Sequence, residues 1–83
     1  MKKITIYSTR ICPYCVRAKN FFNKKNLEYT EIMIDSNPEQ MKEMMEKSGR
    51  QSVPQIFIGD YHVGGFDDLI EHDMDGKLEG LLG

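Results

Sequence analysis

Apolar and polar residues alternate with period two over residues 4–7, and this alternation predicts a first β-strand. The Cys12-Pro13 pair then opens a helix, because proline is favoured at the first helical position. Two lysines and an asparagine at 24–26 end that helix, and residues 27–34, rich in β-branched and aromatic side chains, predict a second strand. The apolar positions that share the buried stripe of the helix are Cys15, Ala18 and Phe22, with Phe21 alongside.

The second half of the chain predicts a helix, a hairpin and then more helix. Asn37-Pro38 caps a helix that ends at Gly49. Short strands at 55–58 and 61–63 flank a Gly-Asp turn, which is typical of a β-hairpin. A third helix follows Gly64-Gly65, and a short leucine-rich terminal helix follows it. The apolar positions expected to face inward are Met41, Met44, Met45, Phe66, Leu69, Ile70, Met74, Leu78, Leu81 and Leu82.

The order of elements, β-α-β-α-β-β-α, indicates an α/β fold. A strand–helix–strand unit implies a parallel pair joined by a right-handed crossover, and the hairpin adds antiparallel strands. The expected architecture is therefore one four-stranded mixed sheet flanked by helices. Cys12 lies just past the carboxyl end of the first strand, the sheet edge where open α/β sheets tend to place their sites.

Size and charge narrow the range of functions. A chain of 83 residues is expected to form a single domain over 1–83, so any large substrate must dock on its surface. The net charge of -2 gives no reason to expect a nucleic-acid or membrane partner. No apolar stretch follows the two N-terminal lysines, so we expect no signal peptide and a cytoplasmic location. The protein is also expected to be a monomer.

The two cysteines, Cys12 and Cys15, are the candidate catalytic residues. A structural disulfide over so small a loop would add only about 2 kcal/mol on the loop-entropy model, so a structural role is disfavoured. Residues i and i+3 of a helix lie on one face, close enough to form a disulfide after a small adjustment. Cys12 is expected to be the exposed attacking thiol, and Cys15 the shielded thiol that resolves the mixed disulfide.

The position of Cys12 at a helix N-terminus favours the thiolate, which is the nucleophile in disulfide exchange. The helix dipole supplies only about 0.3–1 kcal/mol, so direct hydrogen bonds to the sulfur must supply the rest. The expected donors are the N–H groups of Tyr14 and Cys15 and the Cys15 thiol, and Arg10 is expected to add positive potential. A zinc site is the alternative for a Cys-x-x-Cys pair, but only His62, His72 and carboxylates could complete it.

Three separated motifs make the chain resemble the small bacterial dithiol glutaredoxins. They are Ile6-Tyr7 with Cys12-Pro13-Tyr14-Cys15 and Ala18-Lys19; Ser48-Gly49-Arg50 with Ser52-Val53-Pro54-Gln55-Ile56-Phe57-Ile58; and Gly64-Gly65-Phe66-Asp67-Asp68-Leu69. The resemblance covers nearly the whole chain. It implies a thioredoxin-like fold and glutathione as the electron donor, used as a co-substrate and not as a permanently bound cofactor.

The family's motifs also imply where glutathione binds. Pro54 would be a cis-proline opposite the cysteines, and Val53 would pair its backbone N–H and C=O with the peptide. The N–H groups of Gly65, Phe66 and Asp67 would hold the γ-glutamyl carboxylate, and the Asp67 side chain would hold the ammonium. The residues that the resemblance assigns to glutathione are Tyr14, Ser52, Val53, Pro54, Gly65, Phe66 and Asp67.

Three positions depart from the family pattern. Thr9 stands where many members have a lysine for the glycine carboxylate of glutathione, and Arg10 is the neighbouring candidate to replace it. Ser52 replaces a threonine and keeps its hydroxyl. Phe66 stands where several members carry a further cysteine, which excludes a side reaction of a third thiol.

The function expected from these residues is glutathione-dependent reduction of protein disulfides and of glutathione mixed disulfides. The expected partners are glutathione and disulfide-containing or glutathionylated proteins, with ribonucleotide reductase as one candidate. One alternative is a redoxin that serves that enzyme with electrons from thioredoxin reductase. Another is a non-catalytic iron–sulfur carrier, with one Cys12 per protomer and glutathione bridging a dimer.

Overall fold

Four short strands form one mixed sheet in the computed structural model, which describes residues 2–83. They are β1 (Ile4–Ser8), β2 (Thr30–Met33), β3 (Gln55–Ile58) and β4 (Tyr61–Gly64), in the order β2-β1-β3-β4. β1 pairs parallel with β2 and antiparallel with β3, and β3 pairs antiparallel with β4. This is the four-stranded mixed sheet of the thioredoxin-like fold that the sequence predicted.

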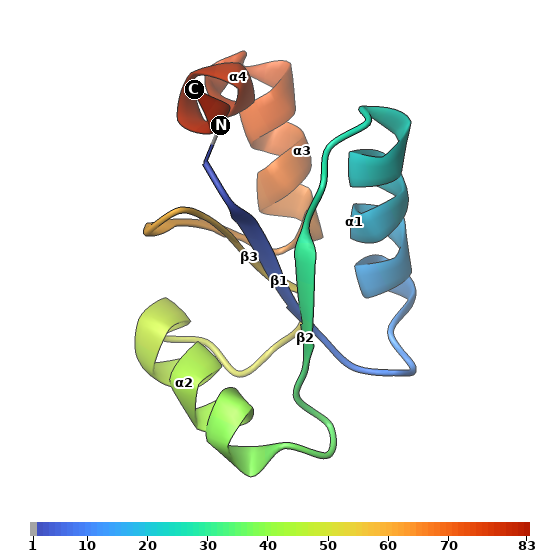
Figure 1. Ribbon diagram of the computed structural model, residues 1–83, viewed down its shortest axis with the longest axis vertical. Helices are drawn as coiled ribbons and strands as arrows, with labels where there is room; N and C mark the ends of the chain where they lie inside the picture. The colour runs from blue at the N-terminus through green and yellow to red at the C-terminus, as the bar shows by residue number, and fades with distance from the viewer. Residues whose placement is uncertain (1) are drawn as a thin grey trace.

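Four helices cover the two faces of the sheet unequally (Figure 1). They are α1 (Pro13–Lys24), α2 (Pro38–Ser48), α3 (Phe66–Met74) and α4 (Lys77–Leu82). α1, α3 and α4 pack over one face, where Ile6 and Ile56 lie against Phe22 and Leu69 in the larger core cluster. α2 covers part of the other face through a smaller cluster of Tyr7, Ile34, Met44 and Phe57.

The alternation along β1 explains these two clusters. Successive side chains of a strand point to opposite faces, so Ile4 and Ile6 join the cluster under α1 and α3 while Tyr7 joins the cluster under α2. Tyr7 lies opposite Ile32 of β2 and Gln55 of β3, which puts the carboxyl end of β1 in the middle of the sheet. The loop that carries Cys12 leaves from this central position.

The second strand is shorter than predicted, because a turn at residues 25–26 and an irregular segment at 27–29 separate α1 from β2. Asn26 adopts a left-handed conformation with φ of 58°, and the Leu27 N–H donates to the Phe22 carbonyl at 3.0 Å. The chain therefore turns out of α1 before it can extend, and β2 starts only at Thr30. The apolar character of Leu27 and Tyr29 reflects packing against the larger core and not strand pairing.

Two methionines predicted to face inward are on the surface. Met41 is 37% exposed and Met74 is 80% exposed, whereas Met44 is fully buried between α2 and the sheet. Met44 is the buried residue of α2, and Met74 is the last residue of α3. No helix among residues 2–83 is long and apolar enough to cross a membrane.

Candidate active site

Cys12 caps the N-terminus of α1 and lies next to Cys15. Its backbone is extended, and its Sγ accepts a hydrogen bond from the Cys15 N–H at 3.1 Å. Pro13 occupies the first helical turn, where its missing N–H is no loss. The two cysteines are joined in a disulfide, with their Cα atoms 5.2 Å apart, inside the range that such a bond allows.

Burial distinguishes the two sulfurs. Cys15 is 1% exposed and continues the apolar stripe of α1 formed with Ala18 and Phe22, whereas Cys12 is half-buried at the rim. An incoming disulfide can therefore reach Cys12, while Cys15 can react only with a group already attached to Cys12. The order of attack and resolution expected from the sequence is compatible with this placement.

The loop before β3 faces the cysteines. The Val53–Pro54 peptide bond is cis, as the family resemblance implied, and the Val53 carbonyl oxygen lies 3.9 Å from Cys12 Sγ. Val53 is half-buried, and Pro54 is buried beneath it. An extended peptide bound to Cys12 would therefore pass directly over the backbone of Val53.

A shallow groove of about 290 Å³ extends from this loop to the start of α3. The rings of Tyr14 and Phe66 face each other across it, with centroids 6.2 Å apart. All seven residues that the sequence assigned to glutathione line this groove, together with two that it did not. The complete lining is Tyr14, Arg50, Ser52, Val53, Pro54, Gly65, Phe66, Asp67 and Asp68.

Arg50 and Asp68 are the two lining residues that the sequence analysis missed. Asp68 Oδ2 accepts the Gly65 N–H at 2.9 Å and an Arg50 N–H at 3.0 Å. The Gly65 hydrogen bond, and after it the Arg50 guanidinium, hold the pKa of Asp68 below its ordinary value. The Gly65 N–H is therefore already used, which leaves the N–H groups of Phe66 and Asp67 for an anion.

The signal for this arrangement was present in the sequence. An acidic residue three positions after a helix N-cap commonly reaches back to the N-cap N–H, and Asp68 stands three positions after Gly65. The pairing with Arg50 joins residues 18 positions apart and depends on the tertiary fold.

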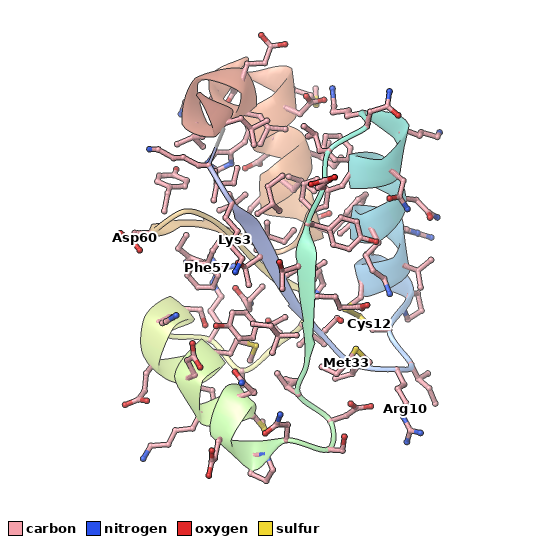
Figure 2. All side chains as sticks on the ribbon, viewed as in Figure 1. Lys3, Arg10, Cys12, Met33, Phe57 and Asp60 are labelled. Carbon is pink, nitrogen blue, oxygen red and sulfur yellow. A yellow bond between two sulfur atoms is a disulfide. The ribbon has the colours of Figure 1, made fainter. Side chains whose placement is uncertain are left out.

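Arg10 contacts Asp35 in the structure. Its backbone N–H and its Nε both donate to Asp35 Oδ2, at 3.1 and 3.2 Å. Figure 2 shows the Arg10 side chain pointing outward, away from Cys12. Whether Arg10 adds positive potential at Cys12, or replaces the lysine absent at Thr9, stays a prediction.

Both histidines are half-buried and hydrogen-bonded. His62 Nε2 lies 2.7 Å from Gln55 Oε1, and His72 contacts the Tyr61 hydroxyl at 2.8 Å. Across residues 2–83 no three His, Cys, Asp or Glu side chains are grouped so that they could hold a metal ion.

The mixed sheet, the helix-capping cysteine and the cis-proline facing it define a thiol–disulfide oxidoreductase of the thioredoxin-like class. Comparison with known proteins narrows the class. The glutaredoxin family profile matches residues 4–63, and the chain belongs to this family.

Individual relatives agree with this assignment over nearly the whole of this chain. The chain is 46% identical over 82 residues to a glutaredoxin of Pseudomonas aeruginosa, covering 99% of this chain and 98% of that protein. It is similar to the solution structure of a Brucella melitensis glutaredoxin, with 49% identity, a TM-score of 0.85 and coverage of 99% and 89%. The crystal structure of a buckwheat glutaredoxin–glutathione complex has 31% identity, a TM-score of 0.88 and coverage of 98% and 76%.

Proposed function

We propose that this glutaredoxin is a cytoplasmic, glutathione-dependent enzyme that reduces protein disulfides and glutathione mixed disulfides. The observation that carries the proposal is the groove beside Cys12, in which a cis-proline loop, two aromatic rings and a helix N-terminus converge. These are the features needed to bind a small, charged, extended peptide next to a reactive sulfur. The glutathione complex of the similar buckwheat protein supports the same choice of ligand.

The reaction starts when the Cys12 thiolate attacks one sulfur of a substrate disulfide and releases the other as a thiolate. The Cys15 thiolate then attacks Cys12 Sγ, which frees the second substrate thiol and leaves the Cys12–Cys15 disulfide. A first glutathione thiolate attacks Cys12 and restores Cys15, and a second attacks the sulfur of the bound glutathione. Two electrons pass from two glutathione molecules to the substrate, and glutathione disulfide leaves.

The bound glutathione would be held along the groove by groups that remain available. The Val53 N–H and C=O would pair with its cysteinyl residue, next to Cys12 Sγ. The N–H groups of Phe66 and Asp67 would hold the γ-glutamyl carboxylate, because the first N–H groups of a helix have no partner within it. The Asp67 carboxylate would hold the ammonium group, and Tyr14 and Phe66 would flank the ligand.

Substitution of each cysteine by serine tests this mechanism. With a glutathionylated protein and glutathione, Cys12→Ser should lose all measurable turnover, because the attacking sulfur is gone. Cys15→Ser should retain deglutathionylation, since glutathione can resolve the mixed disulfide, but should lose most reduction of protein disulfides. Turnover retained in Cys12→Ser would refute the proposal.

Two further measurements test the two alternative functions, the redoxin and the iron–sulfur carrier. Activity with thioredoxin reductase and none with glutathione would assign the chain to the redoxin alternative, with ribonucleotide reductase as the first partner to test. A brown colour with visible absorbance in freshly purified protein would instead indicate the iron–sulfur carrier.

A further inference from the structure

A buried amide links the loop at the active site to the far strand of the sheet. Gln55, immediately after Pro54, is fully buried. Its Nε2 donates to the Ser52 carbonyl at 3.0 Å and contacts the Ser52 hydroxyl at 3.2 Å. Its Oε1 lies 2.7 Å from Nε2 of His62 in β4.

The hydrogen-bond pattern fixes the orientation of this amide and the proton on the histidine. A carbonyl oxygen can only accept, so the nitrogen of the Gln55 amide must face Ser52 and its oxygen must face His62. The ring nitrogen that meets this oxygen must therefore carry a proton, which assigns the Nε2–H form to His62. The ring is held in place by the face of Phe57, with centroids 4.9 Å apart and planes tilted by 30°.

The loop has little else to hold it. Within residues 2–83 the segment 51–53 makes no backbone–backbone hydrogen bond, and it belongs to neither a helix nor a strand. The side chain of Gln55 is thus the main polar anchor of the Ser52 carbonyl, which belongs to the same peptide unit as the Val53 N–H. Val53 in turn places its own carbonyl 3.9 Å from Cys12 Sγ.

We propose that Gln55 and His62 are positioning residues, which hold the Ser52–Val53 backbone in the orientation that receives glutathione. This inference rests on the proposed function for its ligand. Neither residue lines the groove, so both act through Val53 and not by touching the peptide. The neutral Nε2–H form and the imidazolium both donate from Nε2, so protonation of the ring leaves the chain of hydrogen bonds intact.

The test compares two substitutions of His62. His62→Phe keeps a ring against Phe57 but removes the donor, and His62→Gln places an amide nitrogen near the former Nε2 position. We expect His62→Phe to raise KM for glutathione about three- to tenfold with little change in kcat, since a lost hydrogen bond leaves Gln55 Oε1 unpaired. His62→Gln should restore most of the wild-type KM, and the rate of Cys12 alkylation by iodoacetamide should stay unchanged in both.

A ligand-free measurement separates failure of this inference from failure of the proposed function. The ¹⁵N relaxation order parameter of the Val53 amide should fall in His62→Phe and recover in His62→Gln, whatever the electron donor is. Tyr61→Phe is the matched control. Tyr61 precedes His62 in β4, and the substitution removes its hydrogen bond to the imidazole of His72 without touching the loop. Gln55→Met repeats the test from the other end of the chain of hydrogen bonds.

Unchanged KM and unchanged Val53 order in His62→Phe and Gln55→Met would overturn the positioning role. Equal defects in His62→Phe and His62→Gln would also overturn it, because the hydrogen bond would then not be the cause. A wild-type protein without glutathione-dependent turnover would refute the proposed function, and the relaxation data would still decide whether the loop is held by His62.

Discussion

The carboxylate of Asp68 reaches back over the start of its own helix and accepts the N–H of Gly65 at 2.9 Å. This approach requires that Gly64 has no side chain. A Cβ on Gly64 would lie 2.7 Å from Asp68 Cγ, and the residue has φ of 117°, which side chains rarely tolerate. The glycine pair before α3 therefore makes room for the residue that caps the helix at the edge of the groove.

Gly64→Ala should destabilise the protein by about 1–3 kcal/mol, because it combines an unfavourable φ with a collision against Asp68. Urea unfolding measures the change in the free energy of unfolding. Gly80→Ala is the control, since Gly80 lies in α4 with nothing within 4 Å of an added Cβ. That variant should gain about 0.5–1 kcal/mol from the lower cost of placing alanine in a helix. Equal effects at the two positions would contradict the close approach of Asp68.

Asp68→Asn should remove part of the pH dependence of stability. The Gly65 N–H, followed by Arg50, lowers the pKa of Asp68 below its ordinary 3.8. The unfolded chain therefore takes up this proton at a higher pH than the folded protein does. The resulting stability is present above the unfolded pKa and is lost as the pH falls through the folded value.

Thermal melting from pH 7 down to pH 2 checks this expectation. The Tm of the wild type should exceed that of Asp68→Asn at pH 7, and the two curves should converge at the acid end. A constant difference across the whole range would show that the charge of Asp68 does not stabilise the start of α3.

The sequence was sufficient for the parts of the fold that depend on local pattern. Alternation identified β1, and the Cys-Pro step located the start of α1. The sequence pattern failed at Leu27, because the left-handed turn at Asn26 is followed by an irregular segment over 27–29 and not by a strand. No local signal distinguishes these two outcomes, since Leu27 and Tyr29 can pack against the core from a strand or from an irregular segment.

Contacts between distant residues were beyond the reach of sequence pattern. Arg10 was placed near Cys12 by its position in the chain, yet its side chain bonds to Asp35, 25 residues away. The link from His62 to Gln55 depends on the pairing of β4 with β3 and could not be read from spacing. The cis state of Pro54 was available only through resemblance to a family.

Cys12 in the reduced protein should react with iodoacetamide at pH 6 at a rate close to its rate at pH 8. The Cys15 N–H, 3.1 Å from Cys12 Sγ, and the other groups at the start of α1 favour the thiolate. Mass spectrometry of the alkylated protein identifies the modified residue, and Cys15→Ser isolates the reactivity of Cys12. A rate that falls tenfold for each unit of pH below 8 would indicate an ordinary thiol and would contradict the catalytic assignment.

Lys19→Met should raise the pKa of Glu31 toward its ordinary value. Glu31 Oε2 accepts from Lys19 Nζ at 2.8 Å and from the buried Ser8 hydroxyl at 2.6 Å, and these two bonds, that from Lys19 first, lower its pKa. The three side chains join α1, β1 and β2 next to the active-site loop. Because the pair is partly exposed, the substitution should cost no more than about 1 kcal/mol of stability.

An NMR titration of the Glu31 side-chain carboxyl carbon measures the change directly. Lys24→Met, also in α1 but at an exposed position, controls for the general loss of one positive charge from the helix. The Glu31 titration should move to higher pH in Lys19→Met and stay in place in Lys24→Met. If both variants move it equally, the effect comes from the overall charge of α1, and the specific bridge between α1 and β2 has no electrostatic role.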